Sequence, residues 1–99
     1  MIVVRTVIQA KFGKAAELAR LSAEMNREVG EWPGAWRVLT DLSGPFDTVV
    51  LEIEVESLAA WEQARSQLFS QPAFQAAFSR IQELAEGGST EYFTLEATS

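Results

Sequence analysis

Charged residues inside apolar segments are the residues of this chain that are best placed to do chemistry. Arg5 stands within the β-branched run 2–10, and Glu52, Glu54 and Glu56 alternate with apolar residues in a later run. A guanidinium beside a carboxylate in a cleft of low dielectric can hold a polar ligand and shift pKa values. We expect the two runs to form neighbouring antiparallel strands, with Arg5 and Glu52 near their middles. The pattern therefore predicts that Arg5 pairs with Glu52, and that Arg5, Glu52 and Glu54 bind a ligand.

The same charges have plainer interpretations, which we favour over a pocket. A cross-strand ion pair on a partly solvated sheet contributes about 0.2 to 1 kcal/mol and needs no ligand. If a second copy of the chain covers the pair, truncation of Arg5 should cost about 3 to 5 kcal/mol, against at most about 1 if the pair is exposed. Three glutamates at a spacing of two could hold a hard cation. The chain has no His to support such a site, and we predict no metal.

Missing residue types narrow the chemistry further. The chain contains no Cys, which excludes disulfides, thiol nucleophiles and thiolate metal sites. It contains no His, so Ser43 and Ser57 lack the usual activating base for nucleophilic catalysis, and an axial-His haem site is excluded. We therefore expect no cofactor and no catalytic residue, and the sequence leans away from an enzyme.

The net charge of the chain argues against nucleic acids and anionic membranes as partners. Eight Lys and Arg residues face 14 Asp and Glu residues, for a net charge of -6. Nucleic acids and anionic membranes attract basic proteins, so we expect neither as a partner. No apolar run approaches the roughly 18 residues of a membrane span, and the first residues lack the basic start of a signal peptide. The expected location is the cytoplasm.

Ten aromatic residues form a second group that could serve a site. Trp61, Phe74 and Phe78 fall at helical spacing on apolar stripes, which favours core packing over a stacking platform. Trp32 lies instead in a connection that holds Gly30 and Gly34. A large exposed aromatic there would belong to the rim of a binding site or interface, so Trp32 joins the predicted ligand-binding residues.

The elements that must position these residues follow from periodicity. Alternating or β-branched runs predict strands, apolar spacings of three and four predict helices, and Gly or Pro marks the breaks. Gly30 should end the first helix, Ser57 should cap the second, Pro72 should open the third, and Gly87 with Gly88 should end it. The predicted strands are 2–10, 36–42, 48–55 and 91–98, and the predicted helices are 14–29, 58–69 and 72–86.

This order, β-α-β-β-α-α-β, predicts a single domain over residues 1–99 of the ferredoxin-like α+β class. Strand one should lie between strands three and four in a four-stranded antiparallel sheet, with the helices on one face. Strand one is apolar on both faces, with Val4 and Ile8 on one side and Val3 and Val7 on the other. An uncovered apolar face of several hundred Å² marks an interface, so we expect a homodimer.

Several segments carry a resemblance to a known family. They are Leu39-Thr40-Asp41-Leu42-Ser43-Gly44-Pro45-Phe46-Asp47-Thr48-Val49-Val50, Glu54-Val55-Glu56-Ser57-Leu58-Ala59-Ala60-Trp61-Glu62, Gln71-Pro72-Ala73-Phe74 and Gly88-Ser89-Thr90-Glu91-Tyr92. In these segments the chain resembles the NIPSNAP family, and the likeness covers nearly the whole chain. Lys11-Phe12-Gly13-Lys14 is similar to that family's entry into the first helix, with Phe12 in place of its proline.

The resemblance implies a dimeric α/β barrel, in which the sheets of two copies face each other. It also implies a distant relationship to ligand-binding and cofactor-free oxygenase barrels, and it offers no catalytic residues to transfer. The function we expect is therefore a homodimer that binds a small, partly apolar molecule between its two sheets. The alternatives are a cofactor-independent oxygenase of the antibiotic-biosynthesis monooxygenase class and a purely structural or interaction module.

Overall fold

The computed structural model describes residues 1–99, which form three helices and a four-stranded sheet of the α+β class. Its elements follow the predicted order β-α-β-β-α-α-β, which confirms the ferredoxin-like fold. The strands are β1 (Ile2–Ala10), β2 (Trp36–Thr40), β3 (Thr48–Val55) and β4 (Ala85–Thr94), and the helices are α1 (Ala15–Val29), α2 (Leu58–Phe69) and α3 (Pro72–Leu84).

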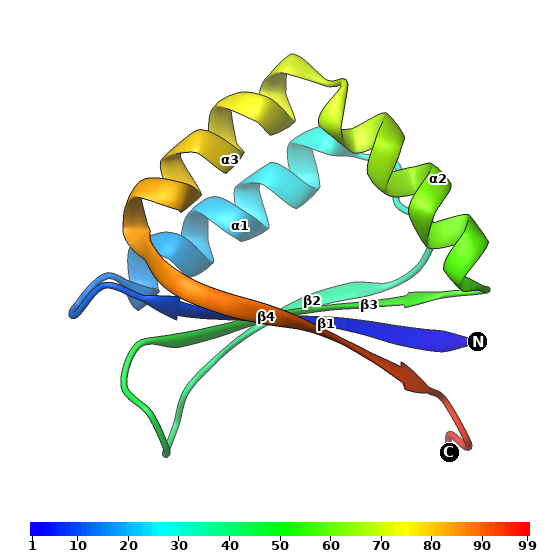
Figure 1. Ribbon diagram of the computed structural model, residues 1–99, viewed down its shortest axis with the longest axis horizontal. Coiled ribbons are helices and arrows are strands. Elements are labelled where there is room, and N and C mark those ends of the chain that lie inside the picture. The colour runs from blue at the N-terminus through cyan, green and yellow to red at the C-terminus, as the bar shows by residue number, and fades with distance from the viewer.

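The molecule has two layers (Figure 1). The four strands form an antiparallel sheet in the order β2-β3-β1-β4, with β1 between β3 and β4 as predicted. All three helices lie on one face of this sheet, and the other face carries no element except the hairpin between β2 and β3, which extends beyond the sheet on that side. No helix of the chain is both long and apolar enough to cross a bilayer.

The register of β1 and β3 decides which side chains meet. Val4 lies opposite Ile53, and the next pair along is Arg5 opposite Glu52. Successive side chains point to opposite faces of a sheet. Val4, Ile53 and Val55 are buried beneath the helices, so Arg5 and Glu52 belong to the opposite face, which we call the open face.

The core consists of two separate clusters. The larger one joins α1 and α3 to the sheet through Leu18, Ile81 and Leu84 among others. The smaller cluster holds only three buried residues, all on strands, namely Val4, Ile53 and Val55. Trp32 packs against both clusters. Such a divided core leaves room between its parts, and this room becomes the cavity described below.

The end of α3 differs from the sequence prediction. The helix ends at Leu84 and β4 begins at Ala85, so Gly87 and Gly88 lie inside a strand instead of terminating the helix. A Cβ atom on Gly88 would stand 2.4 Å from the carbonyl oxygen of Val7, so only glycine allows β4 to approach β1 this closely. The last strand therefore covers 85–94 instead of 91–98, and β2 ends at Thr40, two residues earlier than predicted.

Identifiable groups fix three helix ends, namely the start of α2 and both ends of α1. The hydroxyl of Ser57 accepts a hydrogen bond from the Ala60 amide at 3.1 Å, which confirms its role as the cap of α2. Gly30 ends α1 with a positive φ of 82°. The start of α1 is capped from a distance, because the carboxylate of Asp47 accepts from the amides of Gly13 and Ala15 at 2.9 and 3.2 Å. Asp47 thereby ties the β2–β3 hairpin to the first helix.

Candidate functional site

Two places in the fold gather groups that could do chemistry. One is an ion cluster on the open face of the sheet, built from Arg5, Arg37 and Glu52. The other is a cavity on the opposite side, between the sheet and helices α2 and α3. The sequence directed attention to the first place, and the structure adds the second.

The ion cluster is centred on one carboxylate. Glu52 accepts from Arg5 Nε at 2.8 Å through Oε2 and from Arg37 Nε at 2.7 Å through Oε1. A second nitrogen of each guanidinium lies as close to the same oxygen, so both contacts are short and charge-assisted. The side chain of Glu52 is only 5% exposed, whereas those of Arg5 and Arg37 are 39% and 70% exposed.

Two opposing effects set the pKa of Glu52. Burial raises its pKa, because removal from water disfavours the charged form. The hydrogen bonds and charges of Arg37 and Arg5 together outweigh burial, so the net pKa of Glu52 lies below the ordinary 4.5. Glu52 is therefore an ionised carboxylate with both oxygens occupied, and it is not free to act as a general base.

The pairing of Arg5 with Glu52 confirms the sequence prediction, and the participation of Arg37 was missed. Arg37 lies directly opposite Glu52 in the β2–β3 register. Arg5 also stacks on a neighbour, with its Cζ 5.1 Å from the centre of the Phe93 ring. Glu54 forms no ion pair, and it borders a small hollow of about 110 Å³ on the rim of β2 and β3.

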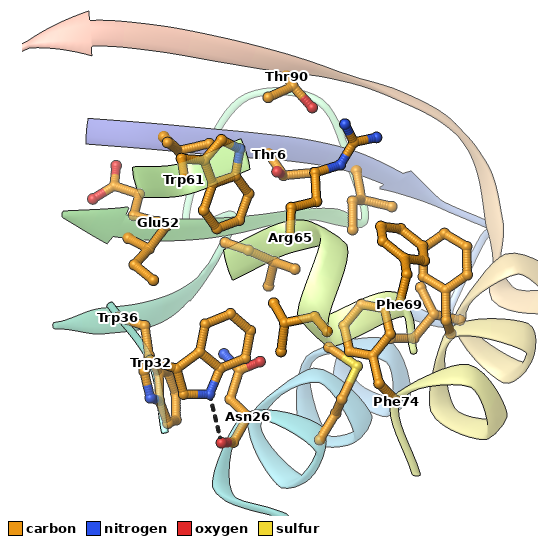
Figure 2. A pocket seen from close by; sticks show the side chains of 18 of the residues that line it. Thr6, Asn26, Trp32, Trp36, Glu52, Trp61, Arg65, Phe69, Phe74 and Thr90 are labelled. Atoms are coloured by element: carbon orange, nitrogen blue, oxygen red, sulfur yellow. Dashed lines mark hydrogen bonds between the residues drawn. The ribbon is translucent and has the colours of Figure 1, made fainter. Parts of the chain in front are cut away.

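The cavity beneath the helices is much larger, with a volume of about 390 Å³. This lies within the range of roughly 300 to 1,000 Å³ that is typical of small-molecule sites. Fourteen of the 19 residues around it are hydrophobic. Figure 2 shows their side chains converging from the strands, from α1 and from α2 and α3.

Aromatic rings form the wall on the helix side. Phe69, at the end of α2, meets Phe74 and Phe78 of α3 edge to face, with ring centres 5.1 and 5.4 Å apart. Phe74 and Phe78 stack nearly parallel at 5.8 Å. Trp61 on α2 also borders the cavity, and it lies near Glu52, away from Phe69 and Phe74 (Figure 2). Besides the core packing predicted for them, Trp61, Phe74 and Phe78 all border the cavity.

The polar groups around the cavity are few, and they differ in exposure. They are the side chains of Thr6, Asn26, Arg65 and Thr90. Glu52 also borders the cavity, but its carboxylate lies on the open face with Arg5 and Arg37. Asn26 lies at the closed end and is only 6% exposed. Arg65 and Thr90 are exposed and lie at the open end, where Phe69 is 39% exposed. The cavity therefore has an inner polar group, a long apolar middle and a charged mouth.

Asn26 is the unusual member of this set. Its backbone oxygen accepts from the indole Nε1 of Trp32 at 2.8 Å, but its side-chain amide forms no hydrogen bond within the chain. Every fully enclosed side-chain nitrogen or oxygen of the protein has a partner. The free amide of Asn26 consequently faces open space, and that space is the cavity (Figure 2).

Trp32 differs from the expectation of an exposed rim residue. It is half-buried, packs against both core clusters and borders the cavity. The hydrogen bond to the backbone oxygen of Asn26 fixes the indole. The loop that carries Trp32 passes close to β3 at Gly34, where a Cβ would overlap the backbone carbonyl of Glu54. Trp32 is therefore a wall of the cavity, held in place from two directions.

The predicted site residues thus separate into two groups. Trp32 and Glu52 border the cavity, whereas Arg5 and Glu54 lie outside it. Sequence reasoning missed Asn26 and Arg65. A signal for Asn26 existed, because it directly follows Met25 on the buried stripe of the first helix and is a polar residue where that stripe is apolar. No group of three or more acidic side chains is placed to hold a metal ion.

Comparison with known proteins gives matches in structure alone. No protein-family model matches the chain, and no curated protein is significantly similar to it. An uncharacterized NIPSNAP domain protein from Burkholderia xenovorans superimposes with a TM-score of 0.86 at 20% identity, covering 100% of this chain and 98% of that one. A NIPSNAP family protein from Agrobacterium tumefaciens gives 0.79 at 21% identity, covering 94% and 90% of the two chains.

A crystal structure of an antibiotic biosynthesis monooxygenase is also similar, with a TM-score of 0.73 at 16% identity over 98% of this chain and 100% of that one. Identities this low establish a shared fold and nothing about a shared chemistry. The resemblance read from the sequence is confirmed at that level: the chain has the ferredoxin-like fold of the NIPSNAP domain proteins.

Proposed function

We propose that this protein binds a small, largely apolar molecule in the cavity between its sheet and its helices α2 and α3. The sequence suggested a site between the sheets of two copies, and the proposal moves the molecule to the other face of the sheet. The observation that carries it is the side-chain amide of Asn26, a residue that is only 6% exposed: this amide has no hydrogen-bond partner within the chain, and the residue borders an apolar cavity. Every fully enclosed side-chain nitrogen or oxygen has a partner, so the amide is accessible from the cavity, where a ligand can supply the hydrogen bond that it lacks.

The shape of the cavity supports a ligand over a water molecule alone. A single buried water needs only about 30 Å³ and two or more polar partners. The cavity is more than ten times as large, and its middle offers aromatic rings instead of polar partners. A planar, mostly apolar molecule would fill this space, remove the aromatic surface from water and leave one hydrogen-bonding atom for Asn26.

Phenylnaphthylamine is a suitable probe, because it is neutral and flat, it carries one N–H group, and its fluorescence rises in apolar surroundings. The protein should bind one probe molecule per chain. Thr6→Phe would place a ring into the cavity from the middle of β1 and should abolish binding. Thr40→Phe introduces the same ring on an exposed strand position outside the cavity and should leave binding unchanged. Equal binding by the Thr6→Phe and wild-type proteins would refute the proposal.

The cofactor-independent oxygenase remains the second candidate, because it would use the same cavity. In that chemistry the protein positions an easily oxidised aromatic molecule that supplies the electrons itself: one atom of dioxygen enters the molecule in place of two hydrogens, and the other leaves with these hydrogens as water. The aromatic wall and the fold shared with an antibiotic biosynthesis monooxygenase are the observations that favour it. Dioxygen uptake by the wild-type protein with a hydroquinone, accompanied by formation of the hydroxylated quinone and absent in Thr6→Phe, would establish this activity.

The proposal includes a homodimer joined through the open face. Val3, Val7 and Val50 lie there with only partial burial, and Phe93 is 45% exposed. The β2–β3 hairpin projects on the same side of the sheet (Figure 1), and Leu42 in its loop is fully exposed. A second copy would cover these apolar groups and the ion cluster while leaving the cavity uncovered, since the cavity lies on the helix side of the sheet.

A further inference from the structure

Arg65 is a cation without a carboxylate partner, and it stands at the mouth of the cavity. The five ion pairs of the chain use Arg5, Arg20, Arg37 and Arg80, and none of them includes Arg65. Its only close contact of note is with Phe69, whose ring centre lies 5.6 Å from Arg65 Cζ. Stacking on an aromatic ring orients a guanidinium and leaves its N–H groups free to donate.

We propose that the ligand of this cavity is an anion: a flat, apolar molecule with one carboxylate or comparable acidic group, which Arg65 binds at the mouth. The inference rests on the proposed function and names the class of molecule that the site prefers. Arg65 borders the cavity together with Thr6 and Thr90, and Figure 2 shows its guanidinium on the same side as these two hydroxyl groups. A guanidinium and two hydroxyls can donate hydrogen bonds to the oxygens of an acidic group.

The charges around the cavity point the same way. Only two of its 19 residues are ionisable at neutral pH, namely Glu52 and Arg65. The charge of Glu52 is compensated by Arg5 and Arg37 on the other side of the sheet. Arg65 is therefore the one uncompensated charge at the cavity, and it is positive in a chain whose net charge is -6. A local positive site in an acidic protein selects the anions that the rest of the surface repels.

The arrangement along the cavity sets the direction in which the ligand lies. Asn26 is buried at the inner end, and Arg65 is exposed at the outer end. An acid that enters with its apolar end first keeps its charged group in contact with both Arg65 and water. It thereby avoids the cost of burying an ion in an apolar site. A hydroxyl, carbonyl or amine at its far end would reach the amide of Asn26.

Two probes that differ by one charged group test this inference. Phenylnaphthylamine is neutral, and anilinonaphthalene sulfonate is the same ring system with an added sulfonate. Arg65→Gln should weaken the binding of the sulfonate by about 10- to 100-fold, since hydrogen bonds to charged groups contribute about 1.5 to 3 kcal/mol. The affinity for the neutral probe should change by less than about twofold, because its contacts are with the apolar wall.

Control variants separate the local effect from net charge. Arg27→Gln removes an arginine that is exposed on α1, lies outside the cavity and forms no ion pair, and it should leave both affinities unchanged. Arg65→Lys keeps the charge and should retain part of the preference for the sulfonate. Raising the salt concentration should weaken sulfonate binding to the wild type and leave the neutral probe unaffected.

The outcomes separate the proposed function of the cavity from its proposed preference for anions. If the wild type binds neither probe, or if Thr6→Phe binds both as well as the wild type, the proposed cavity function is wrong. If the neutral probe binds and the sulfonate does not, or if Arg65→Gln binds the sulfonate as tightly as the wild type, only the anion inference is overturned. In the latter case the contact of Arg65 with Phe69 is structural.

Discussion

Arg5 and Glu52 lie directly opposite each other on adjacent antiparallel strands, and their side chains form a charge-assisted hydrogen bond of 2.8 Å. Glu52 is almost fully buried, and Arg5 is 39% exposed. The pair therefore consists of a buried acid and a half-exposed base, and its energetics depend on what else compensates the acid. Arg37 does so through the other carboxylate oxygen, at 2.7 Å.

The second arginine changes the expected cost of losing the first. Arg5→Ala leaves Glu52 paired with Arg37, so we expect a loss of only about 0.5 to 1.5 kcal/mol in the free energy of unfolding. Arg37→Ala should cost about as little. The double variant leaves a buried carboxylate unpaired and should cost about 3 to 5 kcal/mol, more than the two single losses together. Urea unfolding of the four proteins measures this coupling, and additive losses would show that the arginines act independently.

Low pH should remove the contribution of this ion cluster to the free energy of unfolding. The pKa of Glu52 is lowered in the folded protein, because the hydrogen bonds and charges of Arg37 and Arg5 outweigh the opposing effect of burial. A group of this kind stabilises the fold above its unfolded pKa, near 4.5, and loses that contribution as the pH falls through its lower folded pKa. The stability difference between the wild type and Glu52→Gln should therefore be constant at about pH 6 and shrink towards about pH 3.

The pH experiment has a built-in comparison. Glu17 also has a lowered pKa, chiefly through its hydrogen bond to Arg80, but it lies on α1 and takes no part in the ion cluster. Unfolding curves of Glu52→Gln should become less dependent on pH in the acid range, while the dependence due to Glu17 persists. A stability difference between wild type and Glu52→Gln that stays unchanged down to pH 3 would contradict the assignment.

Asp47 combines a cap with an unusual backbone conformation, and two substitutions separate these roles. Its φ is 58°, a left-handed value that glycine adopts without strain. Asp47→Gly removes only the carboxylate that caps α1 and should cost about 1 to 2 kcal/mol. Asp47→Ala adds the backbone strain and should cost about 1 kcal/mol more. Thermal or urea unfolding ranks the three proteins, and an alanine variant more stable than the glycine variant would be inconsistent with this account.

Much of the fold followed from the sequence because local signals agreed with one another. The strand 48–55 alternates between apolar and polar residues except at Val50, Ser57 stands where a cap is needed, and Pro72 opens a helix whose first turn has no use for its missing N–H group. Gly87 and Gly88 misled the prediction, because two adjacent glycines usually end a helix. Their actual role depends on how closely β1 approaches, which is a tertiary contact that no local pattern reports.

The site was less accessible from the sequence than the fold. The pairing of Arg5 with Glu52 followed from strand parity and register alone. The cavity depends on how far the helices stand from the sheet and on two core clusters that do not merge, and neither fact has a local signature. Arg65 lies on an otherwise ordinary exposed helix surface, so its position at the mouth of a cavity emerges only once α2 is placed over the strands.

The two adjacent glycines of β4 offer a matched test of close packing. A Cβ at Gly88 would stand 2.4 Å from the carbonyl oxygen of Val7, whereas a Cβ at Gly87 would meet nothing within 4 Å. Gly88→Ala should force β4 away from β1 and lower the free energy of unfolding by about 1 to 3 kcal/mol. Gly87→Ala should be neutral within about 0.5 kcal/mol. Equal stability of the two variants would show that β4 adjusts its path without cost.

The proposed dimer can be tested at the centre of the open face. Val7 lies on β1, the strand flanked by β3 and β4, opposite Val50 on one side and Ser89 on the other. We expect the wild type to have twice the mass of one chain in light scattering at micromolar concentration. Val7→Lys would bring two ammonium groups into the interface, one from each copy, and desolvation and repulsion should convert the dimer into a folded monomer. Gln82→Lys, at an exposed position of α3, should leave the dimer intact. A wild type that is monomeric under these conditions would mean that the open face is not covered by a second copy.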